Sequence, residues 1–92
     1  MDQIRSKVLN LQNRCRDWVD DPSASVSRSL QQEVQRLEDE TQSSKNPKSL
    51  EDRVRSVIRL LGQAAQSGAM SHSHADELID QFKDLIQQLR KI

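Results

Sequence analysis

Residues 49–67 have the sequence SLEDRVRSVIRLLGQAAQS, in which apolar side chains recur every three or four positions. This spacing places them along one side of an α-helix and leaves the charged side chains on the other side. The apolar positions are Leu50, Val54, Val57, Ile58, Leu60, Leu61, Ala64 and Ala65. Their stripe is the widest in the chain, so we expect this helix to be the most buried one.

The start and the interior of this helix contain residues with specific backbone properties. Residues 49–52, Ser-Leu-Glu-Asp, resemble a capping arrangement in which the serine oxygen accepts a hydrogen bond from a free backbone amide. Pro47 lacks an amide proton and prevents one continuous helix with the preceding segment. Gly62 costs about 1 kcal/mol relative to alanine inside a helix, so we expect it to permit a close contact with a neighbouring helix.

Helical periodicity recurs in three further segments, residues 2–20, 23–42 and 72–91. Their inward positions are Ile4, Val8, Leu11, Cys15 and Trp18 in the first, Val26, Leu30, Val34 and Leu37 in the second, and Ala75, Leu78, Phe82, Leu85, Leu89 and Ile92 in the third. Asp21 and Pro22 separate the first two helices, because a residue before proline avoids the helical conformation. Proline at a first helical position, after an aspartate able to cap, then begins the second helix.

Four helices of about 19 residues with short connections predict an all-α fold in one domain, residues 1–92. We expect an antiparallel, up-down-up-down four-helix bundle. The alternative is two helical hairpins that dimerise into a bundle, because the first segment has a narrow two-in-seven apolar stripe and the second has the thinnest stripe. Composition agrees: only 2% of the residues are aromatic, which favours helices over strands.

The segment between the last two helices holds both histidines of the chain. We interpret this segment as a turn. Gly68 adopts the left-handed conformation that ends a helix, Met70 enters the core, and a serine caps the next helix, either Ser71 or Ser73. Both histidines then become exposed residues in the first turn of that helix.

Two functional alternatives apply to the same segment. A metal site would use His72 and His74, but no cysteine is near them in sequence, and helical zinc sites space histidines by four residues rather than two. A DNA-binding helix-turn-helix would use Ala64, Gly68 and Ser71, but its second helix would begin with acidic residues that phosphates repel. We therefore predict no metal ligand, no cofactor and no nucleic-acid partner.

The single cysteine, Cys15, is the remaining candidate for chemistry. It lies on the apolar stripe of the first helix, where a free cysteine behaves as a small apolar filler. A catalytic thiol needs a partly exposed, electropositive position and a partner histidine. No Ser-His-Asp set, glycine-rich phosphate loop or paired carboxylate cluster occurs in the sequence. We therefore predict no catalytic residue and a protein that is not an enzyme.

Charge indicates contacts inside the fold rather than a charged partner. The 14 basic and 14 acidic side chains cancel, so no overall field points to nucleic acid or a membrane. Residues 45–67 include five basic and two acidic side chains, whereas residues 22–44 include two basic and four acidic ones. This difference predicts ion pairs between the two helices.

One cysteine and no apolar leader indicate the reducing cytoplasm. No segment approaches the ~18 apolar residues of a membrane span.

We predict a non-enzymatic small helical protein–protein interaction module, an adaptor or regulator. The candidate partner-binding residues are Leu9, which lies off the apolar stripe, Trp18, which packs in the core or anchors a partner, and Arg55 and Arg59 on the outer face of the third helix. Glu51 is placed to pair with Arg55. The alternatives are a self-associating structural unit that forms a homodimeric helical bundle, and a metal-binding protein through His72 and His74.

Overall fold

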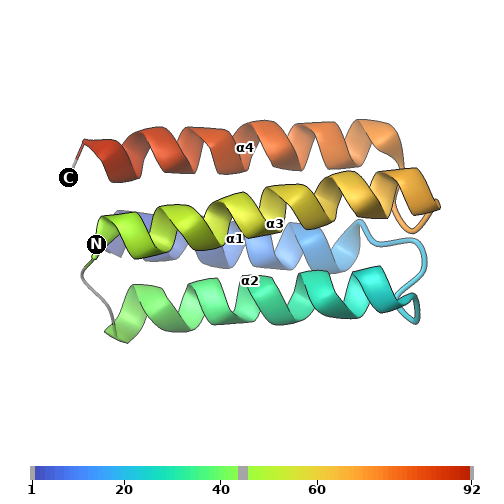
Figure 1. The fold of residues 1–92 in the computed structure, drawn as a ribbon, viewed down its shortest axis with the longest axis horizontal. Coiled ribbons are helices and arrows are strands. Elements are labelled where there is room, and N and C mark those ends of the chain that lie inside the picture. The colour runs from blue at the N-terminus through green and yellow to red at the C-terminus, as the bar shows by residue number, and fades with distance from the viewer. Residues whose placement is uncertain (1, 44–45, 92) are drawn as a thin grey trace.

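The computed structural model describes residues 2–43 and 46–91 and contains four α-helices (Figure 1). They are α1, Asp2–Asp17; α2, Ser25–Ser43; α3, Pro47–Ser67; and α4, His72–Arg90. Successive helices run antiparallel, so α1 and α3 begin at the end of the bundle where α2 and α4 finish. The expected all-α, up-down-up-down four-helix bundle is confirmed, and the two described ranges contain no strand. Ile92, expected on the inner face of the last helix, lies outside them.

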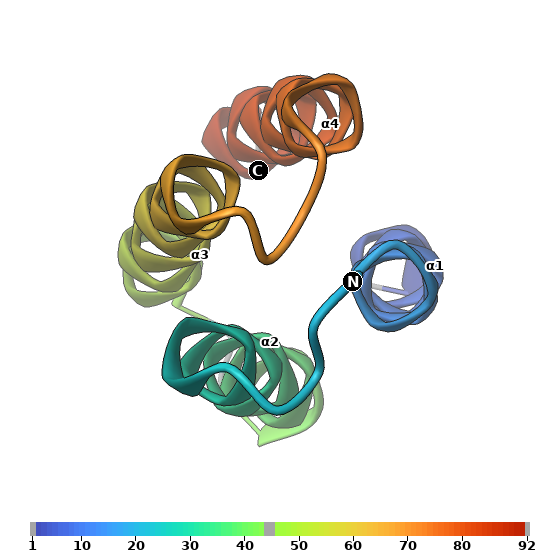
Figure 2. The ribbon, with the colours of Figure 1, turned by 90° about the vertical axis from the view of Figure 1, so that its right-hand side faces the viewer.

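The helices occupy the four corners of the bundle in chain order (Figure 2). Each helix packs against its two neighbours, α1 against α2 and α4, and α3 against the same two, so α1 and α3 are diagonal to each other. The interface between α3 and α4 is the most extensive and the one between α1 and α4 the least. The wide apolar stripe of residues 49–67 thus lies in the largest interface, and α1 is the helix held most weakly.

The chain leaves α1 earlier and enters α2 later than the sequence indicates. The backbone amides of Asp20 and Asp21 donate to the carbonyl oxygen of Ala69, at 2.8 and 3.2 Å, so this segment pairs with the other connection at the same end. The side chain of Asp21 accepts from the backbone amide and hydroxyl of Ser23, at 3.2 and 2.7 Å. The predicted helix boundaries at 20 and 23 are therefore wrong, and Pro22 lies in a turn rather than at the start of α2.

α3 also begins before the predicted position. Its N-cap is Asn46, whose side-chain oxygen accepts from the backbone amide of Lys48 at 3.1 Å, and Pro47 is the first helical residue. Proline suits this position because its fixed φ matches the helix, and because a backbone amide at the first helical position would form no hydrogen bond within the helix. The predicted start at Ser49 is wrong, and the Ser49 hydroxyl instead donates to Glu40 of α2 at 3.2 Å.

The turn between α3 and α4 has the predicted chemistry. Gly68 adopts φ 84°, in the left-handed region, and ends α3. The next two backbone amides, of Ala69 and Met70, donate to the carbonyl oxygen of Ala64, at 2.9 and 3.3 Å. The Met70 side chain is buried, and the Ser71 hydroxyl accepts from the backbone amide of His74 at 3.3 Å, which caps α4. Of the two serines considered, Ser71 is the cap.

The core is formed by apolar side chains from all four helices and the turn between α3 and α4. The buried set is Ile4, Val8, Leu11, Cys15, Leu30, Val34, Leu37, Leu50, Val54, Val57, Leu61, Ala64, Ala65, Ala69, Met70, Ala75, Leu78, Phe82, Leu85, Ile86 and Leu89. A Cβ added at Gly62 would meet no heavy atom within 4 Å. The expectation that Gly62 permits a close helix contact is therefore wrong, because the space beside it is open.

Ion pairs join the outer sides of neighbouring helices as the charge distribution predicts. Arg53 of α3 contacts Glu40 at 2.8 Å and Glu33 at 3.1 Å, both on α2. Glu51 pairs with Arg55 within α3 at 3.4 Å and with Arg90 of α4 at 2.8 Å. The hydrogen bond from Arg90 is the main cause that lowers the pKa of Glu51. These pairs lie on the α2, α3 and α4 sides of the bundle and leave α1 without an ion pair among the described residues.

Candidate binding face on α1

A groove follows the junction of α1 with α4, the weakest interface of the bundle. Its volume is about 540 Å³. It is lined by Gln3, Ser6, Lys7, Asn10, Leu11 and Arg14 of α1 and by Gln81 of α4. We call it the α1/α4 groove. Six of the seven lining side chains are polar and only Leu11 is apolar, so the groove offers hydrogen-bonding groups above an apolar floor.

Lys7 is the cation in the middle of this groove. Its side chain is half-buried, and it forms no ion pair in the part of the chain that the structure describes. A half-buried ammonium loses part of its hydration, and a carboxylate that joined it would offset that loss. Lys7 thus presents an uncompensated positive charge to a molecule that enters the groove.

Arg14 is the second cation of the groove and lies at one of its ends. Its guanidinium donates a hydrogen bond to the side-chain oxygen of Gln81 on α4 and lies 5.9 Å from the ring centroid of Trp18. Trp18 in turn stacks on His74, with the ring centroids 4.5 Å apart and the planes 18° from parallel. Of these three side chains Arg14 lines the groove, and it links the groove to the stacked pair beside the turn that connects α3 to α4.

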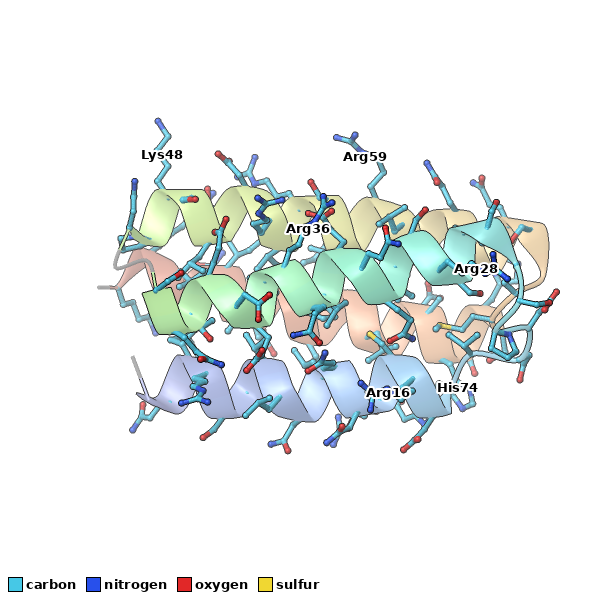
Figure 3. The ribbon with its side chains drawn as sticks, turned by 90° about the horizontal axis from the view of Figure 1, so that it is seen from below. Arg16, Arg28, Arg36, Lys48, Arg59 and His74 are labelled. Atoms are coloured by element: carbon cyan, nitrogen blue, oxygen red, sulfur yellow. The ribbon has the colours of Figure 1, made fainter. Side chains whose placement is uncertain are left out.

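The stacked pair changes two sequence-based expectations. Trp18 is half-buried against the core, so it is neither a fully enclosed core residue nor a free anchor. His72 is exposed as predicted, but His74 is not, because its ring lies under Trp18. The Nδ1 atom of His74 is buried and has no hydrogen-bond partner. Figure 3 shows His74 at the end of the bundle where α1 finishes.

A second, smaller hollow lies on the other side of α1. It measures about 270 Å³ and is lined by Gln12, Arg16, Val19, Pro22, Ser27, Gln31 and Gln35. The amide of Gln12 donates to Gln35 of α2 at 2.8 Å, and Gln35 donates to Glu38 at 3.1 Å. Both long sides of α1 are therefore bordered by hollows with polar walls, which fits its weak hold in the bundle.

Cys15 and the two histidines were the sequence-based candidates for chemistry. Cys15 is fully buried, and burial raises the pKa of its thiol from the ordinary 9.0 to about 12. This placement confirms the interpretation of Cys15 as an apolar filler. Within residues 2–43 and 46–91, no group of three His, Cys, Asp or Glu side chains is arranged to hold a metal ion. The histidines considered as metal ligands from the sequence, His72 and His74, differ in exposure: His72 is exposed and His74 is half-buried.

The four residues predicted to bind a partner do not form one surface. Among the described residues, Leu9 is the exposed large apolar side chain, at 37% exposure; it belongs to α1, and Trp18 directly follows that helix. Arg55 and Arg59 are exposed on α3, at the diagonal corner. Figure 3 shows Arg59 pointing away from the bundle at the edge opposite α1. The structure thus separates the candidates into an α1 set and an α3 set.

The groove residues themselves were not singled out from the sequence. Gln3, Lys7, Asn10 and Arg14 recur at steps of four, three and four, the same spacing as the apolar stripe beside them. This second, polar stripe is the sequence signal that identifies the side of the helix where the groove lies.

No protein-family model, curated protein or solved structure matches the chain. No helix in the described ranges is both long and apolar enough to cross a membrane.

Proposed function

We propose that this chain is a non-enzymatic protein-interaction module that binds its partner through α1, along the α1/α4 groove. The observation that supports the proposal is that hollows lined mainly by polar residues border both sides of α1, the helix with the least extensive packing in the bundle. A bundle needs its apolar positions filled but does not need polar grooves. Polar groups at the edge of an apolar floor are typical of a protein interface.

The chemistry of the buried and exposed groups supports a binding role over a catalytic one. The thiol of Cys15 is enclosed, and the two histidines start α4 without a carboxylate bonded to either ring. Catalysis by a nucleophile requires such a group within hydrogen-bond reach of a base in an accessible site. The groove has amide groups, a hydroxyl and two cations, which suit recognition.

Site-specific photo-crosslinking in the cell of origin tests this proposal. A benzoylphenylalanine is introduced at Asn10 in the groove or at Gln63 on α3, since both are exposed polar residues on helices that lie diagonally. The crosslinked protein is identified by mass spectrometry, purified and mixed with the wild-type chain. We expect a crosslink from position 10 only and a stable complex from the purified components. Crosslinks from position 63 alone would contradict binding through α1.

Self-association is a defined outcome of the same experiment. A crosslinked product that contains only this chain, together with a mass by sedimentation that doubles with concentration, would replace the proposed partner with a second copy. A crosslink to a different protein and a monomer at all concentrations would support the module.

A further inference from the structure

We infer that the α1/α4 groove accepts an acidic helical segment of the partner, with a partner carboxylate bound to Lys7. This inference rests on the proposed function and adds the chemical class of the partner. Among the described side chains, the lining of the groove contains two cations, Lys7 and Arg14, and no carboxylate. The charge of the groove is thus positive, although the whole chain has a formal net charge of zero.

The two cations differ in what they already contact. Arg14 bonds to Gln81 and lies over Trp18, so its guanidinium is held in place at one end of the groove. Lys7 has no such contacts among the described residues. A carboxylate at Lys7 would gain a charge-assisted hydrogen bond without breaking an existing pair. Lys7 is therefore the anchor, and Arg14 adds positive charge nearby.

The spacing of the lining residues fits a helical occupant. The stripe from Gln3 to Arg14 spans about 16 Å at 1.5 Å per residue, which equals three helical turns. A helix that packs against α1 presents side chains every three or four residues, which matches the intervals along this stripe. Asn10 and Gln3 offer amide groups to polar side chains of such a helix, and Leu11 forms the apolar floor. An acidic amphipathic helix matches the spacing of the stripe, the amide groups and the apolar floor.

The charges that line the groove argue against a basic occupant. Exposed Glu77 and Asp84 belong to α4, but neither lines the groove. A basic helix in the groove would place its charges next to Lys7 and Arg14, and like charges in contact are destabilising. Charge complementarity therefore selects the acidic segment.

Two synthetic peptides test the inference directly. Both are alanine-based helices with leucine at the same positions along one side, and they differ in having glutamate or lysine at every charged position. The probe is the amide spectrum of the isotopically labelled chain during titration with each peptide. We expect the glutamate peptide to shift amides of residues 6–14 and of Gln81, and the lysine peptide to bind at least tenfold more weakly. Lys7→Glu should abolish this preference, because the substituted groove has one cation and one carboxylate.

The control variant is Lys48→Glu, which reverses an exposed charge on the diagonal helix. It should leave the affinity for the glutamate peptide unchanged, and circular dichroism should show both variants folded. Equal binding of both peptides, no binding of either, or shifts confined to α2 and α3 would each overturn the inference. A partner that crosslinks at position 10 but binds Lys7→Glu as tightly as wild type would leave the module intact and reject only its acidic partner.

Discussion

Trp18 and His74 stack on each other, with 4.5 Å between ring centroids, at the end of the bundle where α1 stops and α4 begins. The stacked pair joins the end of α1, the helix with the weakest packing, to the start of α4. Val19, which follows Trp18, and Met70, four residues before His74, form an isolated antiparallel bridge that joins the two connections at the same end. One end of α1 is thus fixed by an aromatic contact and backbone pairing, while the groove extends along the rest of its length.

We predict that Trp18 and His74 are energetically coupled. A double-mutant cycle with Trp18→Leu and His74→Leu, followed by urea denaturation, should give a coupling free energy of about 0.5–1.5 kcal/mol. His72→Leu is the control, because His72 is exposed in the same helical turn and should show no coupling to Trp18. Strictly additive effects of the Trp18 and His74 substitutions would show that the stack contributes nothing.

The two glycines should respond to alanine in opposite directions. Gly62→Ala should raise the free energy of unfolding by about 1 kcal/mol, because the added methyl group meets open space and alanine favours the helix. Gly68→Ala should lower it by about 1–2 kcal/mol, because φ 84° is unfavourable for a residue with a Cβ. Thermal or urea unfolding of both variants measures the two changes. Destabilisation by Gly62→Ala would indicate a packing contact that the structure lacks.

The thiol of Cys15 should be unreactive in the folded chain. Burial raises its pKa to about 12, so little thiolate exists near neutral pH, and reagents cannot reach the sulfur. We expect slow labelling by a thiol reagent in buffer and rapid, complete labelling in concentrated guanidinium chloride. Cys15→Ser should destabilise the fold by about 1–3 kcal/mol because it buries a hydroxyl among apolar groups. Native labelling as fast as in the denatured chain would place the thiol at the surface.

The ion pairs of Glu51 should make part of the stability depend on pH. The pKa of Glu51 is lowered from its ordinary 4.5 mainly by the hydrogen bond from Arg90, so the charged form is favoured in the folded state. Its contribution is present above that ordinary value and is lost as the pH falls through the lowered pKa. Glu51→Gln should therefore be less stable than wild type at neutral pH and equal to it in strong acid.

Asp84→Asn provides the matched control for Glu51. Asp84 is exposed and forms no ion pair in the described part of the chain, so its replacement should change stability little at any pH. Urea denaturation across the acid range measures both variants. A difference between Glu51→Gln and wild type that stays constant with pH would rule out the ion pairs as its source.

Local sequence patterns were sufficient to predict the helices, the left-handed Gly68 and the burial of Cys15. They failed where a distant segment decides the conformation. α1 ends at Asp17 because the chain beyond it bonds to Ala69, and His74 is covered because Trp18 approaches from the connection after α1. The start of α3 was missed for a local reason, since Asn46 before Pro47 is a better cap signal than the serine two residues after the proline.

The candidate site was harder to predict than the fold. Lys7 and Arg14 looked like ordinary surface charges in the sequence. Their importance depends on which flank of α1 faces α4 and on how loosely those two helices pack, and neither property is local. The exposed residues that did stand out, Leu9 and Arg59, lie on diagonal helices and therefore on separate surfaces.

Hydrogen exchange of the chain with and without its crosslinked and purified partner tests most directly whether α1 is the binding side. Exchange followed by mass spectrometry reports the protection of each helix. Binding through the α1/α4 groove predicts added protection in α1 and in the part of α4 around Gln81, with α2 and α3 unchanged. Added protection in α2 and α3, with α1 exchanging as in the free chain, would contradict it.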